Sequence, residues 1–248
     1  MMRIGILGAS GRVGTRLVDL VLANPGLELA AALVSPASKR VGVPVNGGSI
    51  EYRPAEAAMK SHCDVMIDFS TPAASMALQE SIGEKNIPMV IGTTGFSAVD
   101  EERLAAFARH RPMLIGANFA HGFEALRMAA VDLARRMPAA EPSVSEIYHV
   151  RKKAEPSGTS LLLARQLYEE RSRAMGFAAP EPAISVQREG DTVGVNELRF
   201  DLGSAEITFT YRVHTLAAYA EGALAAAQWL ISRKPGPGRY TLADCITD

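Results

Sequence analysis

The sequence has few cysteines, almost no net charge and no long apolar run, and each shortage excludes a class of protein. Its two cysteines, Cys63 and Cys245, form no C-x-x-C pair, so they suggest neither a disulfide framework nor a metal site. Twenty-six basic residues against 27 acidic ones leave a formal charge of -1, which gives no electrostatic reason to expect nucleic-acid binding. No apolar run approaches the roughly 18 residues of a membrane span, and the first residues lack the layout of a secretion signal. We therefore expect a cytoplasmic protein without a nucleic-acid or membrane partner.

What the 248 residues do contain is a regular alternation of strand and helix patterns in the first half. Short apolar runs are typical of strands that are buried on both faces, and the stretches between them place apolar residues at helical spacing. Strand, helix and strand in succession predict a parallel sheet of the Rossmann-like α/β class. Strands are predicted at 3–8, 27–35, 64–70, 88–92 and 112–116, and helices at 12–23, from the Thr71-Pro72 cap onward, and at 97–110.

The pattern changes after residue 120. Strands near the end of the chain alternate polar and apolar residues in the two-residue period of half-exposed antiparallel strands. We predict two domains: residues 1–118 bind a dinucleotide and are completed by about 216–248, and residues 119–215 form a smaller mixed α/β domain. Within them, helices are predicted at about 122–136, 157–175 and 216–232, and strands at 143–150, 196–203 and 205–215.

The first chemical motif is "GASGRVG", residues 8–14, which joins the first strand to the first helix. Glycines there permit a tight turn and let the backbone approach a pyrophosphate at the helix N-terminus. An ordinary glycine-rich turn is the alternative, but the position at the first strand-to-helix junction favours dinucleotide binding. The predicted cofactor contacts are Gly8, Ala9, Ser10, Gly11, Arg12, Val13 and Gly14.

The end of the second strand, "ALVSPASKR", bears on which dinucleotide binds. An NAD site usually places a carboxylate there for the ribose hydroxyls. The residues present are instead Ser35, Lys39 and Arg40, whose hydroxyl and basic groups suit a 2′-phosphate. A solvated surface loop would have a similar composition. We predict NADPH as the cofactor, with NADH possible.

Three further loops, "DFSTP", "IGTTGF" and "GANF", each follow a strand. An open α/β sheet binds its ligands at the carboxyl ends of its strands, where these loops must lie. Ser70, Thr71, Gly92, Thr93 and Thr94 are small enough to line a nicotinamide ribose. The alternative is that these are three ordinary loops, but their succession at one edge of the sheet favours a binding site.

The stretch "EIYHVRKKAEPSGTS", residues 146–160, crowds basic and protic side chains together before a helix. It either covers a solvated turn or surrounds an anion that needs a proton. The amides of Ser157, Gly158 and Thr159 would be unsatisfied donors of the first helical turn, a suitable carboxylate site. Lys152 and His149 lie just upstream and could add charge or a proton. Beside a dinucleotide, these groups indicate reduction of a C=N or C=C bond in a small acidic substrate.

In order and spacing, "GASGRVG", "DFSTP", "IGTTGF", "ANF", "KKAEPSGTS" and "REGDTVG" resemble the dihydrodipicolinate (4-hydroxy-tetrahydrodipicolinate) reductase family over nearly the whole chain. The resemblance implies a Rossmann domain completed by C-terminal elements and a mixed α/β domain for substrate binding and tetramer formation. It also implies reduction of a cyclic imine dicarboxylate with NAD(P)H in lysine (diaminopimelate) biosynthesis. By position it assigns Lys152 to proton donation, Gly158 and Thr159 to a substrate carboxylate, and Gly8 to Gly14, Gly92, Thr93, Thr94, Gly116, Ala117, Asn118 and Phe119 to the cofactor.

Several positions depart from the family's pattern. Its usual segment reads roughly E-x-H-H-x-x-K-x-D-A-P-S-G-T, and here Tyr148 replaces the first, catalytic histidine while His149 keeps the second. Ala120 and Glu124 stand where the family usually has Ser and Asn, and Leu216 where a Ser-Arg pair is usual.

Two hypotheses remain open at this point: a reductase, of the lysine-pathway substrate or of another imino or unsaturated acid, and a non-catalytic NADP-binding regulatory protein. The retained Lys152 and PSGT segment favour the enzyme. Tyr148 would serve as a proton donor or orienting group if nearby Arg151 and Lys152 lowered its pKa.

Overall fold

The computed structural model describes residues 1–56 and 62–246. It separates into two compact units. Unit 1 comprises Met1–His121 together with Leu216–Asp248, and unit 2 comprises Gly122–Thr215. No helix in the described residues is long and apolar enough to cross a membrane.

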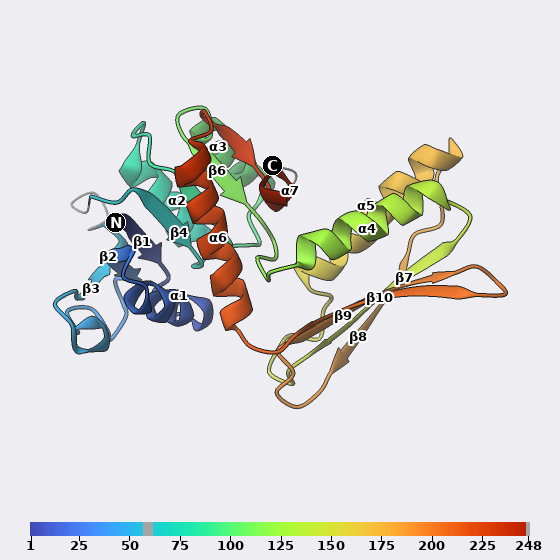
Figure 1. The fold of residues 1–248 in the computed structure, drawn as a ribbon, viewed down its shortest axis with the longest axis horizontal. Helices are drawn as coiled ribbons and strands as arrows, with labels where there is room; N and C mark the ends of the chain where they lie inside the picture. Colours follow the sequence, from blue (N-terminus) through green and yellow to red (C-terminus); the bar gives the residue numbers. More distant parts are fainter. Residues whose placement is uncertain (57–61, 247–248) are drawn as a thin grey trace. The chain divides into compact units, whose positions relative to one another are not determined.

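Unit 1 is built on a seven-stranded sheet in which all the paired strands are parallel (Figure 1). The order is β11-β6-β5-β4-β1-β2-β3, so the chain builds outward on one side of β1 and then on the other. This reversal between β1 and β4 creates the point at which open α/β sheets bind ligands. The predicted Rossmann-like fold is confirmed. The strands are β1 (Met2–Leu7), β2 (Leu27–Val34), β3 (Tyr52–Pro54), β4 (Val65–Asp68), β5 (Met89–Ile91), β6 (Pro112–Ile115) and β11 (Gly238–Tyr240).

Helices cover both faces of this sheet because its strands are apolar on both sides. Ile4 and Ile6 of β1 face the core formed with α1 and α6, whereas Leu7 faces the core formed with α2 and α3. Thr71 caps α2 by accepting a hydrogen bond from the Ala74 amide, with proline at the first helical position, as the sequence predicts. The helices are α1 (Arg12–Ala23), α2 (Pro72–Ile82), α3 (Ala98–Phe107), α6 (Ala217–Arg233), α7 (Leu242–Ile246) and the short 3-10 turn η1 (Val45–Gly47).

Unit 2 has a four-stranded mixed sheet in the order β10-β9-β7-β8, with two helices on one face (Figure 1). Alternate residues of the two central strands, such as Val144, Leu198 and Phe200, are buried beneath the helices, while their neighbours point to the open face. The smaller mixed sheet predicted for this part of the chain is confirmed. The elements are α4 (Phe123–Arg136), β7 (Glu141–Tyr148), α5 (Gly158–Met175), β8 (Ala183–Arg188), β9 (Gly194–Asp201) and β10 (Glu206–Val213).

Two details of unit 2 differ from the sequence prediction. Strand β8 was not predicted, because its sequence "AISVQR" is an edge strand with only a weak apolar alternation. The predicted strand 143–150 is wrong at its end: β7 stops at Tyr148, and His149 and Val150 lie outside it. Lys152 donates its amide to the His149 carbonyl at 3.0 Å, so a turn follows the strand directly.

Candidate active site

The loop of residues 8–14 has the geometry of a phosphate-binding turn. Gly8 has a φ of +81°, and a Cβ there would lie 2.3 Å from the Phe69 carbonyl oxygen. A Cβ on Gly14 would lie 2.0 Å from the Gly8 carbonyl oxygen, so both positions require glycine. Gly11 caps α1 without any side-chain hydrogen bond, and no acidic residue stands in the first turn. These residues fit an anionic pyrophosphate at the helix N-terminus.

The end of β2 carries exposed hydroxyl and basic groups. Ser35, Lys39 and Arg40 are all exposed to solvent. The Arg40 guanidinium donates to the Tyr52 hydroxyl at 3.3 Å and lies 5.5 Å from the centre of that ring, so β3 helps to orient it. No carboxylate follows β2 directly, and the group is suited to hold a phosphate on the ribose.

A buried carboxylate that sequence reasoning missed organises the loop after β4. Asp68 accepts hydrogen bonds on Oδ1 from the Ser70 amide (3.0 Å), the Ser70 hydroxyl (2.6 Å) and the Thr93 hydroxyl (2.9 Å). Burial raises the pKa of Asp68, and these hydrogen bonds oppose the rise. The signal for it was an acidic residue ending an otherwise apolar strand, "VMID". Asp68 therefore fixes two of the predicted hydroxyl groups, while Thr94 stays exposed.

Two aromatic rings lie behind the remaining predicted cofactor residues. The Phe69 and Phe119 rings meet edge to face with centroids 5.6 Å apart, and a Cβ on Gly92 would lie 2.3 Å from the Phe69 ring. Phe119 is buried in the core, so only its backbone remains for a ligand contact. Asn118 is also buried and accepts from the Ala120 amide at 2.9 Å, whereas Ala117 next to Gly116 is exposed.

In unit 2, a buried ion pair holds together the segments that carry the other predicted residues. Glu146 of β7 is fully buried, and its Oε1 accepts from Arg188 Nη2 at 2.9 Å. Its Oε2 accepts from the Ser157 amide at 3.0 Å and the Ser160 hydroxyl at 2.5 Å. Burial alone would raise the pKa of Glu146, but the hydrogen bonds from Ser157, Ser160 and Arg188 hold it below its ordinary value. Arg188 also donates to the carbonyl of Lys153, so the pair anchors the intervening loop.

The start of α5 supplies fewer amides than the sequence predicted. Ser157 caps the helix, with its hydroxyl accepting from the Ser160 amide at 3.2 Å. Its own amide is not a free donor as expected, because Glu146 accepts from it. The amides of Gly158 and Thr159 have no protein acceptor among the described residues. A Cβ on Gly158 would meet no atom within 4 Å, so the space beside Gly158 is open.

Lys152 and Tyr148 are in direct contact. The Lys152 ammonium lies 3.3 Å from the centre of the Tyr148 ring, and the Tyr148 hydroxyl donates to Asn196 Oδ1 at 3.3 Å. Burial raises the pKa of Tyr148, so the lowered pKa on which proton donation by Tyr148 would depend is not found. Arg151 points away to pair with Asp191 at 2.8 Å on the surface.

His149 and the positions that depart from the family pattern have different surroundings. His149 is half-buried just after β7. Ala120 is buried in unit 1, and Leu216 precedes α6 there. Glu124 is engaged in an ion pair with Arg127 in the first turns of α4.

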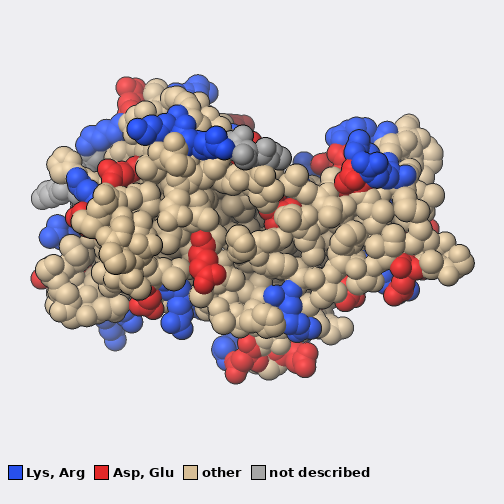
Figure 2. All heavy atoms as spheres, in the orientation of Figure 1, with Lys and Arg blue, Asp and Glu red and all other residues tan. Residues whose placement is uncertain are grey.

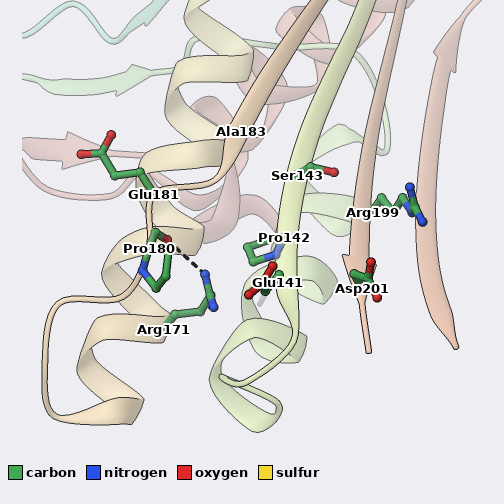
Figure 3. A pocket seen from close by; sticks show the side chains of 9 residues that line it. All are labelled: Glu141, Pro142, Ser143, Arg171, Pro180, Glu181, Ala183, Arg199 and Asp201. Atoms are coloured by element: carbon green, nitrogen blue, oxygen red, sulfur yellow. Dashed lines mark hydrogen bonds between the residues drawn. The ribbon is translucent and has the colours of Figure 1, made fainter. Parts of the chain in front are cut away.

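A hollow of about 250 Å³ lies at the opposite end of β7 from Tyr148 (Figure 3). Arg171, which is only 2% exposed, donates there to the carbonyls of Pro138 (3.0 Å) and Pro180 (3.1 Å). Arg199 is paired with Glu206 at 2.7 Å. Both arginines are therefore engaged in holding the unit together. The hollow is lined by Glu141, Pro142, Ser143, Arg171, Pro180, Glu181, Ala183, Arg199 and Asp201.

Neither the charges on the face drawn in Figure 2 nor the metal-ligating groups of the described residues indicate a second site. Basic and acidic side chains occur together on the face drawn in Figure 2, in keeping with the net charge of -1. Within residues 1–56 and 62–246, no three histidine, cysteine or acidic side chains gather closely enough to hold a metal ion.

Comparison with known proteins agrees with the two units. The family model described as dihydrodipicolinate reductase, N-terminus, matches residues 2–119, and that described as dihydrodipicolinate reductase, C-terminus, matches residues 122–246. The chain is 33% identical, with all of both chains covered, to 4-hydroxy-tetrahydrodipicolinate reductase of Thermomicrobium roseum. It is 35% identical to the enzyme of that name from Nitratidesulfovibrio vulgaris, over 96% of this chain and 97% of the relative.

A solved structure shares the fold. The dipicolinate-bound dihydrodipicolinate reductase from Paenisporosarcina sp. TG-14 matches with a TM-score of 0.76 and 20% identity, over 97% of each chain. Together with the family models and the full-length relatives, this shows that the chain belongs to the dihydrodipicolinate reductase family.

Proposed function

We propose that the protein is an NAD(P)H-dependent reductase of a cyclic imine dicarboxylate, the 4-hydroxy-tetrahydrodipicolinate reductase of lysine biosynthesis. The observation that carries the proposal is the start of α5, where Gly158 and Thr159 begin the helix, the Cβ position of Gly158 is open and Lys152 lies on the adjoining loop. Two amides at a helix N-terminus suit a carboxylate, and a nearby ammonium suits an anionic substrate that takes up a proton. A biosynthetic role of this kind places the enzyme in the cytoplasm.

The residues of unit 1 would hold the cofactor. Gly8 and Gly14 would let the backbone approach the pyrophosphate, and Thr93, fixed by Asp68, would lie beside the ribose. Bound NAD(P)H would supply the hydride. Lys39 and Arg40 give a phosphate on the ribose a charged partner, so NADPH is the preferred cofactor.

The residues of unit 2 would bind the substrate and supply the proton. Gly158 and Thr159 donate to one carboxylate through their amides, with the hydroxyl of Ser157 committed to the helix cap. Lys152 Nζ carries the proton that the reduced centre takes up. His149, half-buried on the same turn, adds a hydrogen-bond donor for the substrate's acidic groups.

The open face of the unit 2 sheet suits assembly into a homotetramer. Its side chains include small polar ones (Ser143, Ser145, Thr208 and Thr210) and charged ones between them (Glu197 and Arg199), on strands that the helices cover only from the other side. An uncovered strand surface of this kind can pack against a second copy of itself.

The test is NADPH oxidation against a panel of cyclic imine acids that includes 4-hydroxy-tetrahydrodipicolinate. Lys152→Ala should lower kcat by about 10²–10⁴, the usual contribution of a positioned general acid. Lys153→Ala is the matched control, since it removes the same charge one residue away and should behave like the wild type. If Lys152→Ala turned over like the wild type, the proton would come from elsewhere. NADPH binding without turnover of any acid in the panel would favour the regulatory alternative.

Gly158→Ala tests the carboxylate site separately. The added methyl group meets no protein atom within 4 Å, so the melting temperature should hold. Because the methyl group would occupy the space beside the two amides, KM for the dicarboxylate should rise while NADPH affinity is unchanged. An unaltered KM would show that the carboxylate binds elsewhere.

A further inference from the structure

We propose that the ring of Tyr148 is the surface that positions the Lys152 ammonium, and that the Tyr148 hydroxyl braces the start of α5 instead of donating a proton. This inference rests on the proposed role of Lys152 as proton donor. It assigns to the phenol ring a positioning role that neither the fold nor the family membership supplies.

The contact geometry supports the first part. Tyr148 is the last residue of β7, and its side chain lies on the buried face of the sheet with those of Val144 and Glu146. The Lys152 Nζ is 3.3 Å from the ring centre, well inside the distance of about 6 Å at which a cation is attracted by an aromatic face. The Arg188 guanidinium lies 5.8 Å from the same centre. The ring is therefore placed against two cations.

The flexibility of lysine makes such a surface useful. Hydrogen bonds fix the backbone of this turn, with Val150 donating to the Gly190 carbonyl at 3.1 Å and Lys152 to the His149 carbonyl at 3.0 Å. The Lys152 side chain still has four rotatable carbon–carbon bonds to order. Contact with the ring face restricts where the ammonium lies.

The hydroxyl is committed elsewhere. It donates to Asn196 Oδ1, Asn196 Nδ2 donates to the Ser160 hydroxyl at 3.4 Å, and that hydroxyl donates to Glu146. This chain of hydrogen bonds links β7, β9 and the first turn of α5. Tyr148 is only 5% exposed, and burial raises the pKa of its phenol. A neutral, enclosed phenol that already donates to an amide is a structural brace.

Kinetics on three variants test the inference. Tyr148→Leu, which removes the ring, should lower kcat by about 2- to 30-fold, the range that a cation on an aromatic face provides. Tyr148→Phe keeps the ring, so it should recover most of that loss. In the Lys152→Ala background, Tyr148→Leu should lower kcat little further, because the ring acts through the lysine. Equal losses in Phe and Leu variants would overturn the inference in favour of the hydroxyl, and a full additional loss in the Lys152→Ala background would show a purely structural role.

A spectroscopic measurement separates this inference from the proposed function. The chain has six lysines, which reductive ¹³C-methylation labels for NMR. A dimethyl-lysine above a ring centre is shifted upfield, so one resonance should stand apart from the other five. It should vanish in Lys152→Arg and persist in Tyr148→Phe. If no resonance is shifted, the ring does not hold Lys152, whether or not the enzyme turns over any substrate. A shifted resonance without turnover of any substrate would refute only the proposal that the protein is a reductase.

Discussion

Replacing Arg188 by methionine should destabilise unit 2 more than any single surface substitution. Glu146 is fully buried and the Arg188 side chain is only 14% exposed, so the variant leaves a carboxylate without its counter-charge. Arg188 also donates to the carbonyls of Lys153 (2.6 and 2.9 Å) and Glu155 (2.9 Å), which lose their partner. Breaking a buried pair costs about 3–5 kcal/mol, and the partial exposure of the arginine reduces our expectation to about 2–4 kcal/mol.

Urea unfolding followed by circular dichroism gives the free energy of unfolding. Arg151→Met is the matched control on the same loop, because its ion pair with Asp191 is exposed (70% and 83% for the two side chains). It should change stability by less than about 1 kcal/mol. The double variant Arg188→Met/Glu146→Gln should be more stable than Arg188→Met alone, since no unpaired charge then remains buried.

Two outcomes would refute this reasoning. A loss below about 1 kcal/mol in Arg188→Met would mean that water reaches Glu146 when the arginine is removed. A double variant no more stable than Arg188→Met would mean that the carbonyl contacts, and not the charge, carry the effect.

At temperatures where both proteins are folded, kcat should also fall in Arg188→Met because the loop that carries Lys152 is less well held.

Three further predictions concern the cofactor, pH and assembly. Lys39→Ala/Arg40→Ala should narrow the preference for NADPH over NADH by removing charge-assisted contacts worth about 1.5–3 kcal/mol each; titration showing NADH as the tighter ligand of the wild type would contradict it. Burial raises the pKa of Asp68 above its ordinary value of 3.8, so the wild-type protein loses stability as the pH rises from 3.8 towards the folded-state pKa. The Asp68→Asn variant has no such loss. Its melting temperature, relative to that of the wild type, should therefore increase from acid to neutral pH. A constant difference between the two would refute this account. Light scattering should find a tetramer, and a stable monomer at micromolar concentration would argue against the open face of β9 and β10 as an interface.

Much of unit 1 follows from local sequence. Uninterrupted apolar runs, in contrast to an alternation of polar and apolar residues, predict strands that are buried on both faces. The cap at Thr71-Pro72 predicts where α2 begins. The need for glycine at Gly8 and Gly14 is also local, because the turn itself makes the close backbone contacts. The three-residue strands β3 and β11 were missed, since so short a segment has too few residues to show a period.

The interactions that organise the site could not be predicted in the same way, because they join distant positions. Glu146 and Arg188 are 42 residues apart, and Asp68 and Thr93 are 25 apart. Which carboxylate accepts from the Ser157 amide depends on the register of β7 against its neighbours, and no local signal encodes that. The Ser157 amide was therefore expected to be a free donor, whereas it donates to the buried carboxylate of Glu146.

Tyr148 shows how sequence neighbours mislead about electrostatics. Two cations follow it within four residues, and proximity along the chain suggested that they would lower the pKa of its phenol. A strand, however, sends alternate side chains to opposite faces, and Tyr148 shares the buried face with Glu146, two residues before it. The hydroxyl consequently enters the interior, where burial raises its pKa, while the Lys152 ammonium lies over the centre of the ring. A cation stabilises a phenolate only when it lies near the oxygen that carries the charge. A tyrosine and a lysine close together in sequence therefore give a lysine that contacts a neutral ring. The face of the strand to which the tyrosine points is the feature of the sequence that distinguishes this arrangement from an activated tyrosine.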